Sequence, residues 1–512
     1  MRNARRMHMR VYTSALLCAL FALPQVALAA DAPKAPAPPP HAAASDTVST
    51  HHEVTIGGRT IAYTATAGTI EIKSEKGTPE ARVFYIAYTE DGADPVHRPV
   101  TFLYNGGPGC ASVPLDMGAL GPRRVVFPNA AHNVGPPYQL VNNEYSLLDK
   151  SDLVFIDAPG TGYSRLLPKV DPKTVYGIDQ DAAAFGAFIY QYVTRNDRWN
   201  SPKFLLGESY GTPRSAVLVN YLQTNDSMAF NGVILLSSVL DFDTIAPGPG
   251  NDIAYVTYFP TEAAVNWYHS KSPNKGSLQS VVNEARAFAN GPYASALLQG
   301  DRLPHAQFVQ IATQMSRLIG LSTGYIEKAD LRVQPERFEK ELMRESNDNI
   351  GRLDARYVGP DIDPLGDSAD YDPADSSTDP GFQASFLSYV RNELDWKSDE
   401  TYSECSGDVF QDWDFTRKGT FPWLAPTTSA DLAQALTLNP HLRVFVGAGY
   451  FDMATPFGAA EWTFSHLGLH AGLREHITFG YYESGHMVYL HVPSLAKFHG
   501  DLDRFFDATM GQ

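Results

Sequence analysis

Cysteine is scarce in this chain of 512 residues, which has three, and only Cys110 and Cys405 lie beyond the first thirty residues. Two cysteines allow one disulfide but exclude a small fold held together by many. Basic residues are also too few to balance the acidic ones, since 40 Lys and Arg oppose 57 Asp and Glu, a net charge of −17. An acidic chain repels phosphate, so we expect neither nucleic acid nor an anionic membrane as a partner.

Long apolar runs are missing after the first thirty residues. The run at residues 11–23 is short for a bilayer span and follows four arginines within the first ten residues. Ala27-Leu28-Ala29 then gives the small-x-small pattern of a signal-peptide cleavage site. We therefore expect residues 1–29 to be a signal peptide and the product to be exported, to the periplasm or the cell exterior, without stable membrane association.

Metal and nucleotide motifs are absent as well: the sequence has no HExxH, no CxxC and no Walker loop. We therefore expect no metal and no cofactor. Residues 361–380 carry seven Asp and no Lys or Arg. Leu365 stands where an EF-hand loop needs an oxygen ligand, so this stretch is predicted to be a solvated acidic loop and not a calcium site.

The remaining composition is that of a globular protein, with 44 % apolar and 19 % charged residues. Residues 30–50 are rich in Pro and Ala and predict an extended tether. Residues 53–88 alternate apolar and polar side chains in runs separated by glycine turns, a pattern that predicts antiparallel strands.

From about residue 99 the pattern changes to short apolar runs that alternate with amphipathic helices, such as 182–193 and 213–223. Continuous apolar runs indicate parallel strands buried on both faces, and they are expected at 99–104, 152–157, 203–206, 232–238, 442–448 and 476–482. Between 245 and 425 the strand signal fades and helical spacing dominates. We predict an α/β fold in which residues 51–244 and 426–512 form the core and 245–425 form a mainly helical insertion.

The sequence Gly207-Glu208-Ser209-Tyr210-Gly211 lies between a predicted strand and a predicted helix. This is the context of a nucleophile elbow, in which a serine sits on a tight turn and the helix N-terminus stabilises a developing oxyanion. The pattern GxSxG also occurs by chance, and the flanking strand and helix favour the nucleophile.

A nucleophilic serine needs a base, and the base needs an orienting carboxylate. Asp452 and His486 each follow a later predicted strand, in the order Ser, Asp, His of α/β-hydrolases. Asp157 is a rival acid, but it precedes the serine. The glycine-rich turn 105–110 follows another strand and fits equally well as the second half of an oxyanion hole or as a tight structural turn.

Taken together, these motifs resemble the serine carboxypeptidase family. The residues that carry the resemblance are NGGPGC (105–110), GPRRV from Gly121, DLVFIDAPGTGYS (152–164), GESYG (207–211), GAGYFDMATPFGAAEW (447–462) and ESGHM (483–487). They follow one another in family order over residues 99–500. The resemblance implies an α/β-hydrolase fold and release of C-terminal amino acids from peptides.

The resemblance also implies roles for single residues. Ser209 would be the nucleophile, His486 the base and Asp452 its orienter, and the N–H groups of Gly107 and Tyr210 would form the oxyanion hole. The free carboxylate of a peptide would be held by Asn105, Gly106 and Glu208. Cys110 would pair with a cysteine in the later half of the chain, for which only Cys405 is available.

Two positions depart from the family pattern. Leu103 stands where the family usually has Trp, and Ala119 stands where it has an acid that shares a hydrogen bond with the glutamate before the nucleophile. These departures keep open an alternative in which the same three residues serve an esterase or an acyltransferase. A catalytically inactive secreted binding protein is a further alternative, which an intact triad disfavours.

Overall fold

The structure of the protein is a computed structural model, which describes residues 47–132, 135–270, 276–421 and 424–511. The expected signal peptide and most of the expected tether lie outside these residues. The tether was expected to reach residue 50, but strand β1 already begins at Thr47, because Thr47 pairs with Gly68 of the next strand. In the described residues no helix is both long and apolar enough to cross a membrane.

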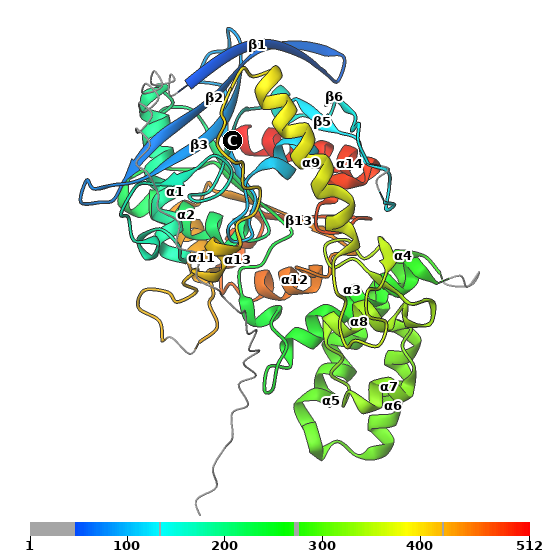
Figure 1. The fold of residues 1–512 in the computed structure, drawn as a ribbon. Coiled ribbons are helices and arrows are strands. Elements are labelled where there is room, and N and C mark those ends of the chain that lie inside the picture. The colour runs from blue at the N-terminus through cyan, green and yellow to red at the C-terminus, as the bar shows by residue number, and fades with distance from the viewer. Residues whose placement is uncertain (1–46, 133–134, 271–275, 422–423, 512) are drawn as a thin grey trace, which may run out of the picture. The chain divides into compact units, whose positions relative to one another are not determined.

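Ten strands form the main sheet (Figure 1). They are β1 (Thr47–Ile56), β2 (Arg59–Lys73), β3 (Pro79–Glu90), β4 (Val100–Tyr104), β7 (Asp152–Ile156), β8 (Arg165–Leu166), β9 (Lys203–Glu208), β10 (Gly232–Leu236), β13 (Arg443–Gly449) and β14 (Ile477–Tyr482). Their order is β1-β2-β3-β7-β4-β9-β10-β13-β14, and β8 pairs with β3. Two small sheets join β5 (Arg123–Val125) to β6 (Leu140–Asn142) and β11 (Asp348–Ile350) to β12 (Val358–Pro360).

The sheet is mixed in a way that follows the sequence pattern. The strands β1, β2 and β3 are antiparallel, and β3 is antiparallel to β7. From β7 onward each neighbouring pair is parallel. This is the mostly parallel sheet expected from the sequence, and the α/β-hydrolase fold is confirmed.

The helices of the described residues follow in chain order. They are α1 (Ile178–Arg195), α2 (Gly211–Asn225), α3 (Ile253–His269), α4 (Leu278–Phe288), α5 (Ala294–Gln299), α6 (His305–Ile319), α7 (Thr323–Lys328), α8 (Pro335–Glu341), α9 (Pro373–Asn392), α10 (Gly407–Gln411), α11 (Ser429–Leu438), α12 (Phe457–Ser465), α13 (Ala471–Arg474) and α14 (Val492–Met510).

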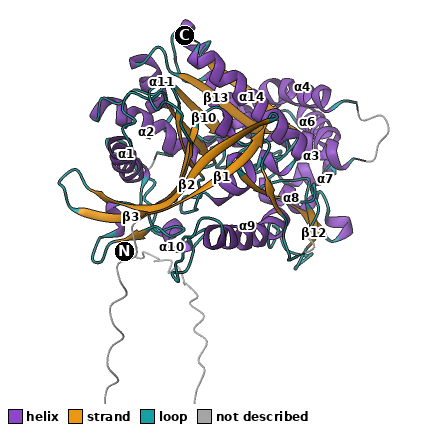
Figure 2. Cartoon of the chain, turned by 90° about the horizontal axis from the view of Figure 1, so that it is seen from above, coloured by secondary structure: helices purple, strands orange, loops and turns teal. Residues whose placement is uncertain are grey.

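Both faces of β7, β4, β9 and β10 are buried. On one face Leu205 and Leu235 pack with α1, α2 and α11, and on the other Leu206 and Leu236 pack with α14 (Figure 2). Successive strand residues point to opposite faces, so a strand covered on both sides must be apolar at every position. This explains the continuous apolar runs in the sequence.

Between β10 and β13 the chain is mainly helical, with the β11–β12 pair among the helices. A third apolar cluster joins α3, α4 and α6 to Phe451 and Phe457, which follow β13. The acidic stretch 361–380, expected to be a loop throughout, is helical from Pro373. Asp372 caps this helix by accepting a hydrogen bond from the Ala374 N–H at 2.8 Å, and proline suits the first helical position.

Candidate active site

Ser209 stands at a sharp turn between the end of β9 and the start of α2. Its φ is +60°, in the left-handed region that most residues avoid, and its N–H donates to the Leu236 carbonyl at 3.0 Å. A Cβ atom added at Gly207 would lie 2.0 Å from the Gly211 carbonyl oxygen, so only glycine fits there. The two glycines around Ser209 therefore allow the strand and the helix to approach closely enough to form the elbow.

Asp452 and His486 follow two neighbouring parallel strands, β13 and β14, and so emerge at the same edge of the sheet. His486 Nδ1 lies 2.8 Å from Asp452 Oδ2. Asp452 Oδ1 accepts the N–H groups of Ala454 and Thr455 at 2.8 and 2.9 Å, and the Thr455 hydroxyl donates to Oδ2 at 2.7 Å. Asp452 is fully buried, and these donors fix its orientation toward the imidazole.

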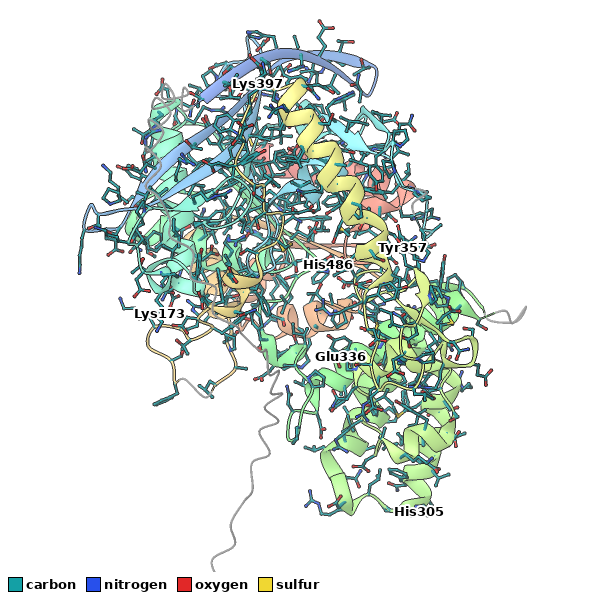
Figure 3. The ribbon with its side chains drawn as sticks, viewed as in Figure 1. Lys173, His305, Glu336, Tyr357, Lys397 and His486 are labelled. Atoms are coloured by element: carbon teal, nitrogen blue, oxygen red, sulfur yellow. A yellow bond between two sulfur atoms is a disulfide. The ribbon has the colours of Figure 1, made fainter. Side chains whose placement is uncertain are left out.

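The backbone of His486 is fixed as well, and its side chain lies inside the molecule (Figure 3). The Ser237 hydroxyl donates to its carbonyl at 2.6 Å, and its own N–H donates to Leu353 at 2.6 Å. Burial disfavours the charged ring, but the carboxylates of Asp452 and Glu208 outweigh it and raise the pKa of His486. Nothing in the spacing of Thr455 or Ser237 in the sequence points to their support of this pair.

Ser209 and His486 are not joined by a hydrogen bond in the described part of the chain. Unliganded enzymes often hold nucleophile and base slightly apart, and the bond forms when substrate is bound. The sheet order places β9, β10, β13 and β14 side by side, so Ser209, Asp452 and His486 all follow the carboxyl ends of neighbouring parallel strands.

The turn 105–107 packs directly against the elbow. A Cβ atom at Gly106 would lie 2.3 Å from the Tyr210 nitrogen, and Gly107 has a φ of +108°. Tyr210 precedes the first residue of α2, where backbone N–H groups have no partner within the helix. Among the described residues, neither Gly107 nor Tyr210 donates its N–H to another group, so both remain available to an oxyanion.

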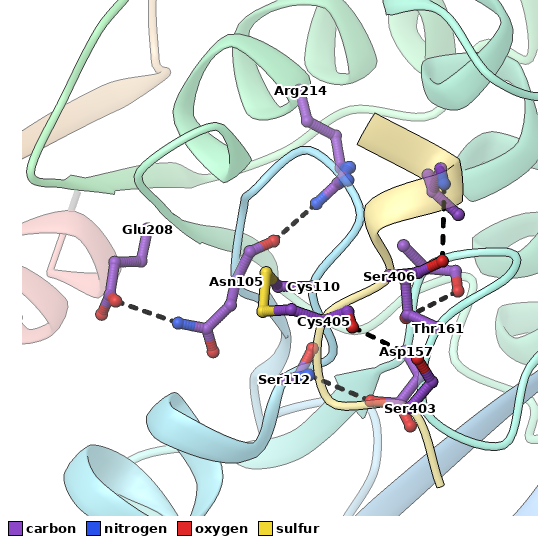
Figure 4. The surroundings of a disulfide bond; sticks show 12 residues. Asn105, Cys110, Ser112, Asp157, Thr161, Glu208, Arg214, Ser403, Cys405 and Ser406 are labelled. Carbon is purple, nitrogen blue, oxygen red and sulfur yellow. Dashed lines mark hydrogen bonds between the residues drawn. A yellow bond between two sulfur atoms is a disulfide. The ribbon is translucent and has the colours of Figure 1, made fainter. Parts of the chain in front are cut away.

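Asn105 connects this turn to the glutamate before the nucleophile (Figure 4). Its Nδ2 donates to Glu208 Oε1 at 2.9 Å, and its Oδ1 accepts the Leu115 N–H at 3.1 Å. The second contact fixes which end of the amide faces Glu208. Arg214, fully buried and paired with Asp181 at 2.6 Å, donates to the Asn105 carbonyl at 2.7 Å and anchors the residue from behind.

The carboxyl of Glu208 is buried, and within the described residues only one of its two oxygens has hydrogen-bond partners. Its Oε1 accepts hydrogen bonds from Asn105 and from the Tyr489 hydroxyl, the latter at 3.2 Å, whereas its buried Oε2 has no partner in the described protein. Burial raises the pKa of Glu208 to about 7, although nearby His486 and the two hydrogen bonds lower it. Tyr489 was not found from the sequence, where nothing in its spacing points to Glu208.

The expected disulfide is confirmed: Cys110 is bonded to Cys405 with an S–S distance of 2.02 Å. Backbone hydrogen bonds run beside it, from Ala111 to Glu404 at 2.7 Å and from Ser406 to Gly109 at 2.8 Å. The disulfide therefore ties residues 403–406 to the turn that carries Gly107 (Figure 4).

Asp157, the rival acid, has other partners. It accepts hydrogen bonds from the Ser112 N–H at 3.0 Å and from the Tyr402 hydroxyl at 3.1 Å. Asp452, and not Asp157, is the carboxylate bonded to His486.

One group of possible metal ligands meets in the described residues, namely Asp149, His499 and Asp503. Burial lowers the pKa of His499, but the carboxylates of Asp149 and Asp503 outweigh burial, so that the pKa of His499 is raised. A separate cavity of about 630 Å³ in the helical region is lined by Tyr255, Arg332 and neighbours, and none of the candidate site residues lines it.

Residues 60–477 match the serine carboxypeptidase family. Serine carboxypeptidase-like 26 of Arabidopsis thaliana is 26 % identical over 35 % of this chain and 39 % of its own, and a pheromone-processing carboxypeptidase of Candida dubliniensis is 22 % identical over 40 % and 28 %. A P-(S)-hydroxymandelonitrile lyase of Sorghum bicolor is 29 % identical over 35 % and 34 %. The chain thus spans between about a quarter and two fifths of the length of these relatives.

Solved structures give a weaker likeness. A proline iminopeptidase of Mycobacterium smegmatis aligns over 86 % of this chain and 99 % of its own, with 13 % identity and a TM-score of 0.37. The strand order identifies the fold, and the match over residues 60–477 identifies the family. The chain belongs to the serine carboxypeptidase family.

Proposed function

We propose that this protein is a serine-type carboxypeptidase that releases amino acids from the free C-terminus of peptides. Its nucleophile is Ser209, its base is His486, and Asp452 orients the base. The observation that carries the proposal is the buried carboxyl of Glu208, which directly precedes Ser209 in the chain and keeps Oε2 without a protein partner. A buried polar atom without a partner is costly, and a ligand group can satisfy it.

The proposed reaction steps start from the hydrogen-bonded pair of His486 and Asp452. Ser209 Oγ attacks the carbonyl carbon of the last peptide bond while His486 Nε2 takes its proton, and Asp452 stabilises the imidazolium through Nδ1. The N–H groups of Gly107 and Tyr210 hold the oxyanion. His486 then gives the proton to the leaving amine, and water attacks the acyl-enzyme by the same route, so no cofactor is needed.

The proposed C-terminal specificity lies in Asn105, Gly106 and Glu208. An ionised Glu208 would repel a peptide carboxylate, by about 4 kcal/mol at 4 Å and an effective dielectric constant near 20. A protonated Glu208 instead donates a hydrogen bond to it. The raised pKa of Glu208 supports this reading, because the neutral form is present in mildly acidic solution.

A second function uses the same three residues for ester hydrolysis or acyl transfer. Ala119 favours it, since the side chain at this position offers no acid to share a proton with Glu208. A catalytically inactive binding protein is a third, less favoured function. Labelling of Ser209 by a fluorophosphonate, absent in Ser209→Ala, would exclude the inactive protein.

We also propose that the protein is exported. The disulfide supports this, because disulfides persist in oxidising compartments.

The experiment that separates the first two functions is a mass-spectrometric profile of products from unblocked peptides, run beside a panel of simple esters. We expect products shortened one residue at a time from the C-terminus. Internal cleavage, or ester turnover without any peptide shortening, would overturn the proposal in favour of the second function.

A further inference from the structure

The Glu208 carboxyl is held asymmetrically. Both of its protein donors, the Asn105 amide and the Tyr489 hydroxyl, bond to Oε1, and Oε2 is left without one. Two donors on one oxygen place that oxygen in the role of acceptor. The proton of a neutral Glu208 must then sit on Oε2, the buried oxygen that has no partner among the described residues.

Tyr489 reaches Glu208 from a separate part of the chain. It lies in the 3-10 turn Val488–Leu490, shortly after His486, and its side chain is 2 % exposed. Its ring packs on the π-helical turn Leu115–Leu120, because a Cβ atom at Gly118 would lie 2.7 Å from the Tyr489 ring carbon Cε2. Gly118 thus makes the space that the ring occupies.

The π-helical turn itself supplies no partner for Glu208. Residue 119 is an alanine, and the one acid of the turn, Asp116, is bonded to the Tyr88 hydroxyl at 3.1 Å through both carboxylate oxygens. The Tyr489 hydroxyl is therefore the donor that joins Asn105 on Glu208 Oε1.

We propose that Tyr489 is a positioning residue for substrate carboxylate recognition, which holds Glu208 through Oε1 so that the protonated Oε2 is presented to the C-terminus of the peptide. This inference rests on the proposed carboxypeptidase function. It adds a residue that acts through Glu208 and does not touch substrate.

A phenol differs from an acid in this position. An acid partner shares its proton with Glu208 and titrates in the same pH range, whereas burial raises the pKa of Tyr489 well above its usual range, so that it stays a donor throughout. A donor stabilises the ionised carboxylate. Removing the hydroxyl should therefore make Glu208 hold its proton to a higher pH.

Several charged groups near this pair shift its pKa values. His486 lowers the pKa of Glu208, and Asp452 raises it. Glu404 raises the pKa of Tyr489, and Arg352 lowers the pKa of His486. None of these groups is altered by Tyr489→Phe. Phenylalanine keeps the packing of the ring, so the substitution removes only the hydrogen bond to Glu208.

The test compares Tyr489→Phe with the full-length wild type on a free-acid peptide and its C-terminal amide. In Tyr489→Phe we expect the alkaline limb of kcat/KM for the free acid to move up by about 1 pH unit, the size of one hydrogen bond to a charged group. The amide profile should not move. Tyr88→Phe is the matched control, because it removes an equally buried hydroxyl that bonds Asp116, and its profiles should overlay those of the wild type.

A second measurement does not depend on peptidase activity. The carboxyl stretch of protonated Glu208 in infrared spectra, assigned by its loss in Glu208→Gln, should titrate at a higher pH in Tyr489→Phe. The role of Tyr489 is refuted if, in Tyr489→Phe, the titration of this band and the alkaline limb of kcat/KM for the free-acid peptide stay at the same pH or move to a lower pH. If wild-type enzyme treats acid and amide alike while the band still shifts, the proposed function fails and the Tyr489–Glu208 coupling stands.

Discussion

At the scale of single residues, the proposed mechanism depends first on the Ser209 hydroxyl. We expect Ser209→Ala to lower kcat by about 10⁴–10⁶ and His486→Ala by a similar factor, since nucleophile and base act as a unit. The fold should persist, because Ser209 keeps its turn through backbone contacts. Steady-state kinetics and melting temperature measure both effects, and Ser346→Ala, an exposed serine, serves as the control. Retention of half the activity in Ser209→Ala would refute the mechanism.

Glu208 gives a prediction about pH. Its pKa near 7 means that free-acid peptides meet a neutral donor below pH 7 and a repelling carboxylate above it. On the acid side, activity falls when His486 becomes protonated, because the base is lost. Glu208→Gln keeps a donor at every pH, so we expect kcat/KM for free-acid peptides to lose its alkaline limb. An alkaline limb that persists unchanged in Glu208→Gln would mean that another group controls it.

The sequence was informative about residues whose role depends on local context. The nucleophile elbow needs a strand, two glycines and a helix start, all within one short segment around Ser209. Asp452 and His486 could be proposed because each follows a strand in a fixed chain order. Tyr489 could not, since its contact with Glu208 joins residues 281 positions apart and depends on the space left by Gly118.

At the scale of elements, the disulfide and two backbone hydrogen bonds hold the segment 403–406 against the turn 105–110, which carries Gly107. The disulfide closes a loop between positions separated by 295 residues, and loop-entropy models assign such a bond a few kcal/mol. We expect reduction to lower the melting temperature by several degrees and also to lower kcat, because the Gly107 turn loses its covalent support. Calorimetry and kinetics with and without reductant measure this, and a Cys110→Ala/Cys405→Ala variant should not respond to reductant. Full activity after complete reduction would show that the Cys110–Cys405 disulfide is not needed to hold the turn that carries Gly107.

Strands and helices were predictable from the sequence where the pattern of apolar residues was long and uniform. The parallel strands are apolar along most of their length because helices cover both faces, and this pattern is visible in the sequence. The start of α9 was missed because the density of Asp suggested a loop. The signal was nevertheless present, since Asp372 followed by Pro373 is a helix cap followed by a favoured first residue.

At the scale of the whole molecule, the buried carboxyls set the dependence of stability on pH. Burial raises the pKa of Glu208 to about 7, and that of Glu262, Asp375 and Glu404 to about 8. The folded state therefore binds more protons than the unfolded state between about pH 4 and 8, and the free energy of unfolding falls as pH rises through this range. His486, whose folded pKa is also raised, acts in the same direction.

Glu262 isolates this effect. It is 4 % exposed in α3, far along the chain from the nucleophile, and burial alone raises its pKa. Glu262→Gln removes the cost of protonating this carboxyl on folding, on the order of 3 kcal/mol near pH 7. We expect a higher melting temperature at pH 7.5 and little change at pH 4.5, with the exposed Glu475→Gln as control. An equal change in melting temperature at both pH values would show that folding does not raise the pKa of Glu262.

The most direct test of the central claim, C-terminal carboxylate recognition at Glu208, is the ratio of kcat/KM for one peptide as free acid and as amide, measured in the wild-type protein at pH 5 and pH 8. We expect the free acid to be preferred by roughly 100-fold or more at pH 5, and this preference to fall at least about tenfold at pH 8, as Glu208 ionises and repels the peptide carboxylate. A ratio near one at both pH values would contradict the account.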